Sequence, residues 1–123
     1  MKKTAIVILS DPRNNAEDAL GRVFNALVLA NDLKNREKDF KIFFQGVGTR
    51  WVEELEMSSH PAHALYTGVK SSIAGVSAAC ATVFKANAQN CGVPILSEFD
   101  IPGIGGATSL AKYLLEGYNI VTF

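Results

Sequence analysis

Thr4-Ala5-Ile6-Val7-Ile8-Leu9 is a run in which apolar residues follow one another without alternation. A strand with one face in water alternates apolar and polar residues, whereas a continuous apolar run is typical of a strand covered on both faces. Strands of that kind belong to parallel sheets whose crossover helices cover both faces. The run therefore predicts an α/β fold with its first strand at residues 4–9.

A helix and a second strand are expected after this run. Asp11-Pro12 ends the strand, and a core-facing helix is predicted from a cap at Asn15 to about Lys34, because apolar residues recur there at spacings of three and four. Those residues are Leu20, Val23, Phe24 and Leu27. A strand at 40–44 completes a βαβ unit, in which the two strands are parallel.

The rest of the chain continues the alternation of helix and strand. The expected elements are a helix at 46–56, a helix from Pro61, a strand at 73–79, a helix at 80–89, a short strand at 93–96, a Pro- and Gly-rich loop at 98–106, a helix at 107–116 and a strand at 119–123. This order predicts a three-layer α/β/α sandwich on a mainly parallel, five-stranded sheet. A length of 123 residues fits a single domain over residues 1–123.

Charge and composition narrow the possible partners. Twelve Lys and Arg balance twelve Asp and Glu, so there is no excess of positive charge for a nucleic-acid backbone and we expect no nucleic-acid partner. No run approaches the roughly 20 apolar residues that span a bilayer, so no membrane segment is expected. Two cysteines are too few for a disulfide scaffold, and we expect a cytoplasmic protein.

Self-association is also expected. A net charge of zero removes the repulsion that keeps copies apart. Val28, Leu29 and Leu33 add a second apolar stripe to the first helix, and in a small domain the second covering can be another subunit. We therefore expect a homo-oligomer.

Cys80 is the sharpest candidate for chemistry. It is expected to follow the strand at 73–79 and to begin a helix, where backbone N–H groups and the helix dipole stabilise a thiolate. The thiolate is the nucleophilic form of cysteine. The alternative is that Cys80, flanked by Ala78, Ala79 and Ala81, is simply a small buried hydrophobic residue.

A binding pocket is expected beyond the carboxyl ends of the strands, where parallel sheets hold their ligands. There, Gln45-Gly46-Val47-Gly48-Thr49 joins a strand to a helix, and its glycines permit close approach to a small ligand or a thiol. Backbone donors in such a loop favour anionic sulfur. The expected lining residues are Asp11, Asn14, Gln45, Gly46, Val47 and Gly48.

Other features carry weaker signals. On a continuous helix the sulfurs of Cys80 and Cys91 would be about 15 Å apart, beyond disulfide reach, so Cys91 is interpreted as structural. His60 and His63 have a metal-ligand spacing, but Pro61 separates them and no thiol or carboxylate completes a set. We predict no metal site and no cofactor; a metal-dependent enzyme built on the two histidines is the least favoured alternative.

Several segments together resemble the DsrE/DsrF family, the small sulfur-relay proteins that include the TusD-like subunits. The resemblance covers nearly the whole chain, and the order and spacing of its segments are moderately specific. The segments are Ser10-Asp11-Pro12, the Ala- and Leu-rich helix through Ala30, Phe43-Phe44-Gln45-Gly46-Val47-Gly48, Ala78-Ala79-Cys80-Ala81, Lys85-Ala86-Asn87, Pro102-Gly103-Ile104-Gly105-Gly106 and Leu114-Leu115-Glu116-Gly117-Tyr118-Asn119-Ile120.

The resemblance implies a flavodoxin-like fold with a mainly parallel sheet, assembly into oligomers, and sulfur donor and acceptor proteins as partners. In sulfur-carrying members a cysteine after a central strand holds a persulfide and passes the sulfur on, and Cys80 matches that position. No further cysteine follows Cys91 before the last residue, Phe123, which argues against the role of acceptors that use a carboxyl-terminal cysteine.

The leading hypothesis is a sulfur carrier or sulfurtransferase-like protein that holds a persulfide on Cys80. The alternative is a non-catalytic oligomeric module that binds a small ligand or a protein at the same edge, with Cys80 merely packed in the core.

Overall fold

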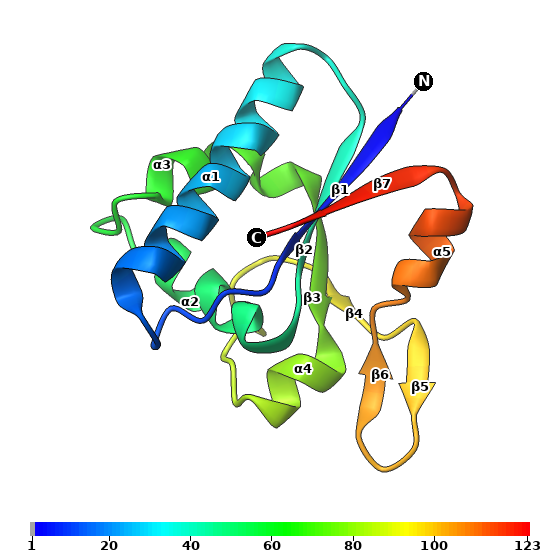
Figure 1. Ribbon diagram of the computed structural model, residues 1–123. Coiled ribbons are helices and arrows are strands. Elements are labelled where there is room, and N and C mark those ends of the chain that lie inside the picture. Colours follow the sequence, from blue (N-terminus) through cyan, green and yellow to red (C-terminus); the bar gives the residue numbers. More distant parts are fainter. Residues whose placement is uncertain (1) are drawn as a thin grey trace.

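The computed structural model describes residues 2–123, and a five-stranded sheet forms its centre (Figure 1). The strands lie in the order β4-β3-β2-β1-β7, and all the pairs are parallel. They are β1 (Lys3–Ile8), β2 (Phe40–Phe44), β3 (Ile73–Ser77), β4 (Ile95–Leu96) and β7 (Tyr118–Thr122). The predicted parallel sheet is therefore confirmed.

Helices cover both faces of the sheet. Figure 1 shows α1, α2 and α3 on one side and α5 on the other. The helices are α1 (Ala16–Asn35), α2 (Trp51–Leu55), α3 (His63–Val69), α4 (Ala78–Val83) and α5 (Leu110–Leu115), with the 3-10 turns η1 (Gly46–Arg50) and η2 (Lys70–Ser72). This arrangement is the predicted three-layer α/β/α sandwich of flavodoxin-like type.

The side chains of β1 explain why its sequence does not alternate. Ile6 and Ile8 point into the larger core, which lies under α1, α2 and α3. Ala5 and Val7 point to the opposite face and pack with Phe43 and Tyr113. Because both faces of the strand are buried, every position from 5 to 8 is apolar.

The long helix α1 differs in part from its predicted pattern. Val23 and Leu27 are fully buried, as the spacing predicts. Phe24, which was also expected to face the core, is 44% exposed, and Val28 on the same outer side is 40% exposed. Asn15 is the residue at the N-cap, but it has a left-handed backbone with φ of 53° and its side chain makes no capping hydrogen bond.

The helix that carries Cys80 is shorter than predicted and begins earlier. β3 ends at Ser77 rather than at residue 79, and α4 stops at Val83 rather than at 89. Lys85 adopts a left-handed φ of 53°, and the N–H groups of Lys85 and Ala86 return to the carbonyls of Thr82 and Ala81. This is a Schellman motif, which usually has glycine at the left-handed position. Because lysine rather than glycine occupies this position, no signal in the sequence marks the end of the helix here.

The predicted loop at 98–106 is instead a hairpin. β5 (Phe99–Ile101) pairs antiparallel with β6 (Gly105–Ala107). The Pro102-Gly103 pair forms the turn: Gly103 has φ of 80° and the N–H of Ile104 donates to the carbonyl of Ile101 at 3.0 Å. α5 consequently begins at Leu110 rather than 107, after a Ser109 cap.

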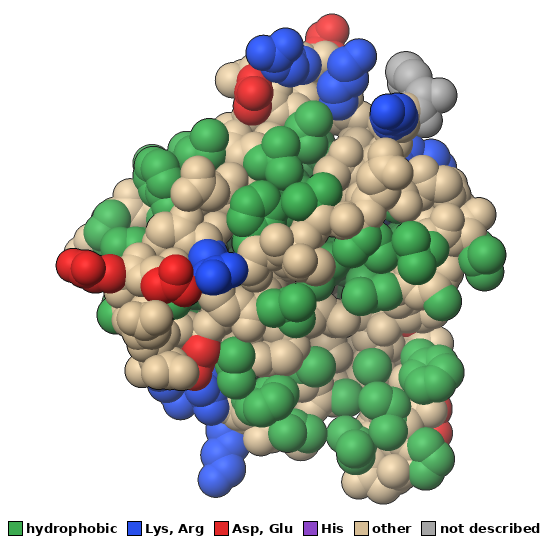
Figure 2. Space-filling model, viewed as in Figure 1, with side chains coloured by type: hydrophobic (Ala, Val, Ile, Leu, Met, Phe, Trp, Pro, Cys, Tyr) green, Lys and Arg blue, Asp and Glu red, His purple; other side chains and the backbone are tan. Residues whose placement is uncertain are grey.

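Exposed apolar side chains gather over this hairpin and over α5, on the right of Figure 2. They are Phe99, Ile104, Leu114 and Leu115. Among the helices of the described residues, none has the length and apolar character needed to cross a membrane.

Candidate functional site at the carboxyl edge of the sheet

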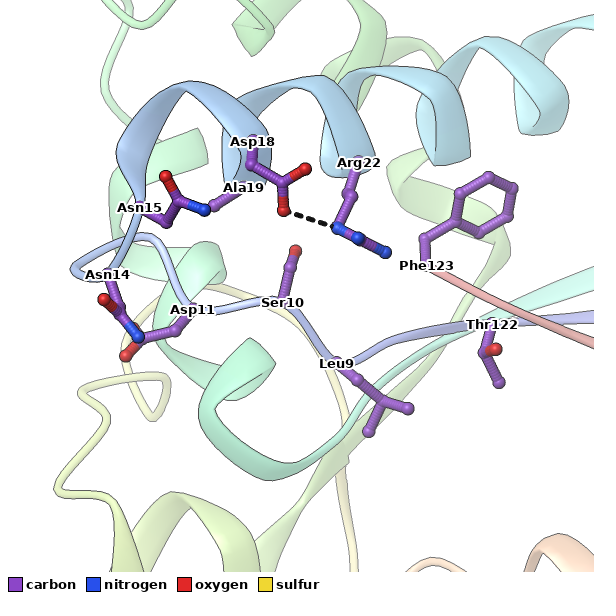
Figure 3. A pocket seen from close by; sticks show the side chains of 10 residues that line it. All are labelled: Leu9, Ser10, Asp11, Asn14, Asn15, Asp18, Ala19, Arg22, Thr122 and Phe123. Carbon is purple, nitrogen blue, oxygen red and sulfur yellow. Dashed lines mark hydrogen bonds and ion pairs between the residues drawn. The ribbon is translucent and has the colours of Figure 1, made fainter.

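A cavity of about 420 Å³ opens at the carboxyl ends of β1 and β7, beside the start of α1 (Figure 3). β7 lies on the opposite side of β1 from β2, so the cavity lies where the strand order reverses, the usual ligand position in an α/β sheet. Its lining residues are Leu9, Ser10, Asp11, Asn14, Asn15, Asp18, Ala19, Arg22, Thr122 and Phe123.

Two of the predicted binding residues, Asp11 and Asn14, lie in this cavity. Arg22 also lines it, but its Nε is 2.7 Å from the Asp18 carboxylate, so much of its charge is already paired. Figure 3 shows this pair on α1 above the Ser10 side chain. The cavity therefore combines Arg22, which is paired with Asp18, with the Asp11 carboxylate and uncharged polar groups from the loop after β1.

The other predicted binding residues, Gln45, Gly46, Val47 and Gly48, are not among its lining residues. Gln45 precedes η1 and the other three residues begin it, and η1 packs against the end of β1. Gly48 is buried, and a Cβ atom on it would lie 2.1 Å from the carbonyl oxygen of Ile8. Glycine at position 48 thus allows the backbone of η1 to pack against the backbone of β1, and not against a ligand in this cavity.

Cys80 lies in the first turn of α4 and is half-buried. Its backbone N–H points to the Oγ of the fully buried Ser77, at 3.4 Å, so Ser77 caps the helix. Cys80 does not line the cavity at β1 and β7, and a smaller cavity of about 210 Å³ along α4 is lined by Ala78, Ala81 and their neighbours rather than by the cysteine. Cys80 is thus a partly exposed residue that lines neither of these two cavities.

Arg50 links the two parts of this edge. Its Nη1 donates to both carboxylate oxygens of Asp11, at 3.2 and 3.1 Å, and its Nε donates to the carbonyl oxygen of Phe84 at 3.1 Å. Phe84 follows α4 and donates its N–H to the carbonyl of Cys80 at 2.9 Å. Sequence reasoning missed Arg50, because no motif marks it and its partners lie 39 and 34 positions away.

Cys91 lies beyond the end of the helix that carries Cys80. Because α4 ends at Val83, the predicted continuous helix between the two cysteines does not exist. Cys91 packs partly buried against the larger core. Burial raises the pKa of its thiol, and the Glu56 and Glu53 carboxylates raise that pKa further against an opposing effect of Lys70.

The Nδ1 atoms of both histidines lie within hydrogen-bonding distance of nearby backbone groups. The Nδ1 atom of His60 accepts the N–H of Ala62 at 3.1 Å, and the Nδ1 of His63 lies 2.7 Å from the carbonyl oxygen of Leu55. Within residues 2–123, no three His, Cys, Asp or Glu side chains gather closely enough to hold a metal ion.

Comparison with known proteins decides the family. The profile of the DsrE/DsrF-like family matches residues 2–123. The chain belongs to this family. The DsrE/DsrF-like chain is also similar to the uncharacterized protein MJ0733 of Methanocaldococcus jannaschii, with 29% identity over 119 residues that cover 97% of this chain and 93% of that protein. No solved structure matches it.

Membership of the DsrE/DsrF-like family suggests a function related to sulfur relay. MJ0733 carries no assigned activity, so it adds similarity along nearly the whole chain but no substrate.

Proposed function

We propose that this protein is a sulfur carrier that holds a persulfide on Cys80 and passes its terminal sulfur to an acceptor thiol. The family supplies the class of chemistry. By its resemblance to the sulfur-carrying members, Cys80 follows a central strand, β3, as their sulfur-carrying cysteine does. The observation that carries the proposal is the partial exposure of Cys80 at the carboxyl edge, because an enclosed sulfur has no route to a donor.

The proposed reaction is two exchanges at sulfur. The Cys80 thiolate attacks the terminal sulfur of a donor persulfide; a bond forms between that sulfur and Sγ, the sulfur–sulfur bond of the donor breaks, and the donor leaves as a thiolate. An acceptor thiolate then attacks the terminal sulfur on Cys80, and the Cys80 thiolate leaves. Each step exchanges one sulfur–sulfur bond for another, so no outside oxidant or reductant is required.

The two cysteines can be followed separately. Trypsin cleavage after Lys70, Lys85 and Lys112 places Cys80 in peptide 71–85 and Cys91 in peptide 86–112. After incubation with a small persulfide donor, peptide 71–85 should gain about 32 Da, the mass of one sulfur atom. Cys80→Ser should abolish the gain, and Cys91→Ser, the matched control, should keep it. A wild type whose peptide 71–85 gains no mass, or a gain confined to peptide 86–112, would refute the assignment.

A second candidate function is favoured by the cavity. It lies at the reversal of the strand order and contains Asp11 and Asn14 but not Cys80, as expected for a module that binds a small ligand without using the cysteine. Under this alternative, a metabolite without reactive sulfur raises the melting temperature of the protein. Asn14→Ala should abolish that increase and Cys80→Ser should leave it intact; the opposite pattern would favour the carrier.

We also propose that the protein forms a homo-oligomer and works in the cytoplasm with sulfur donor and acceptor proteins. The partly exposed Phe24 and Val28 on α1 support a second copy as the covering of this helix. Light scattering after size exclusion should give a mass above 13.2 kDa for the wild type and a smaller assembly for Phe24→Ser. A monomeric wild type would contradict the proposal.

A further inference from the structure

Arg50 bridges the loop after β1 and the helix that carries Cys80, although it lies on neither. We propose that Arg50 is a positioning residue for Cys80: by holding the end of α4 it keeps the thiol half-buried and shields the sulfur on Cys80 from thiols in bulk solution. This inference rests on the proposed function of Cys80 and adds a residue that governs access to it.

α4 needs support from outside itself. It has only six residues, and helices this short are unstable in isolation. Ser77 caps its start. At its end, the Arg50 guanidinium donates through Nε to the carbonyl oxygen of Phe84. A positive charge at this end also interacts favourably with the helix dipole.

Arg50 is itself held in place. Its side chain and that of Asp11 are each 19% exposed, and the guanidinium carbon lies 5.9 Å from the centre of the Phe84 ring. Asp11 is oriented in turn by the N–H of Arg13, which donates to its Oδ1 at 3.0 Å. The planar fork of arginine can reach the carboxylate and the carbonyl together, whereas a lysine ammonium is a single point of charge.

The hydrogen bond from Arg50 to Phe84 affects Cys80 through the last turn of α4. Residues four apart lie on the same face of a helix, and the N–H of Phe84 donates to the carbonyl of Cys80. Loss of the Arg50 contacts therefore weakens the turn that contains the cysteine. Local opening of such a turn exposes the thiol without unfolding the core.

The test compares the rates at which iodoacetamide alkylates the two cysteines of the intact, folded protein, read from peptides 71–85 and 86–112. Arg50→Ala should raise the rate at Cys80 about tenfold, because hydrogen bonds to a charged group are lost, and change the rate at Cys91 less than twofold. Added guanidinium ion should restore the slow rate, and Arg50→Lys should not. Arg36→Ala, which removes an exposed pair with Asp32, is the matched control.

An unchanged or lower rate at Cys80 in Arg50→Ala would overturn the proposal. If both cysteines of that variant react faster together, the same measurement on Asp11→Asn decides: a rise confined to Cys80 supports the proposal, and any other result overturns it.

Alkylation needs no persulfide, so its outcome is independent of sulfur loading. If the wild type never gains sulfur but its Cys80 is still shielded by Arg50, the proposed function fails and the positioning role stands. If the wild type does load, 2-mercaptoethanol should discharge the persulfide about tenfold faster from Arg50→Ala than from the wild type. An unchanged discharge rate would overturn the shielding of the carried sulfur.

Discussion

Gly48 packs against Ile8 so closely that a Cβ atom at position 48 would lie 2.1 Å from the Ile8 carbonyl oxygen. This contact brings η1 against the end of β1. Arg50 and Trp51 follow Gly48 closely in the chain. The Trp51 indole N–H donates to the carbonyl oxygen of Ser10 at 2.9 Å. The loop after β1 and the turn after β2 therefore form one unit.

Gly48→Ala should destabilise the protein, because backbone atoms rather than a flexible side chain occupy the space of the new methyl group. The free energy of unfolding should fall by about 1–3 kcal/mol, the usual cost of overpacking. Urea denaturation measures this change. Gly21→Ala is the matched control: nothing lies within 4 Å of a Cβ there, and alanine in α1 should add about 0.5–1 kcal/mol of stability. Equal effects at both sites would contradict this account.

Leu27→Ala should cost about 2–5 kcal/mol, because it leaves a cavity between α1 and the sheet where the side chain is now fully buried. Phe24→Ala on the same helix removes a larger side chain that is 44% exposed, and a smaller loss is expected. Denaturation at a concentration where the wild type and both variants are monomeric provides the comparison. A greater loss for Phe24→Ala under these conditions would contradict the burial of the two side chains.

Glu98 should make stability depend on acid pH. Burial raises the pKa of its carboxyl, but hydrogen bonds from the Tyr113 hydroxyl, the Ser109 N–H and Lys112 outweigh burial, so the net pKa lies below its ordinary value. A carboxylate with a lowered pKa contributes stability above its unfolded pKa of about 4.3. That contribution is lost as the pH falls through the folded pKa.

Glu98→Gln should therefore lower the unfolding free energy by about 1 kcal/mol at neutral pH and by less in acid. Thermal unfolding followed from about pH 7 to pH 3 measures the difference. Glu37→Gln, at an exposed turn, serves as the control and should leave the pH dependence close to that of the wild type. A constant gap between wild type and Glu98→Gln at every pH would contradict the assignment.

Cys91 should be slow to react in the folded protein. Burial raises the pKa of its thiol above the ordinary value of about 8.5, and this favours the neutral form. The stability linked to that neutral thiol is present below pH 8.5 or so and is lost as the pH rises through the folded pKa. Iodoacetamide should label Cys91 faster in the denatured chain than in the folded chain at the same pH; equal rates would contradict the shift.

The sequence alone determined the layered architecture. Residues 4–9 lack alternation because both faces of β1 are covered, and that requirement is visible in the residue types themselves. The strand at 40–44 was predicted with its observed bounds for the same kind of reason. Local chemistry was less informative where a signal was atypical: Lys85 ends α4 in a conformation that usually has glycine, and Pro102-Gly103 turns a hairpin rather than an open loop.

The contacts that join the loop after β1 to the segment after Cys80 were decided only by the tertiary structure. Asp11, Arg50 and Phe84 follow three different strands, and the parallel sheet brings their segments to one edge. No spacing in the chain encodes such a contact, because it depends on the twist of the sheet and on how closely Gly48 lets η1 approach β1. Residue types indicated the candidate residues along the chain, whereas packing decided which segments meet and added Arg50 to them.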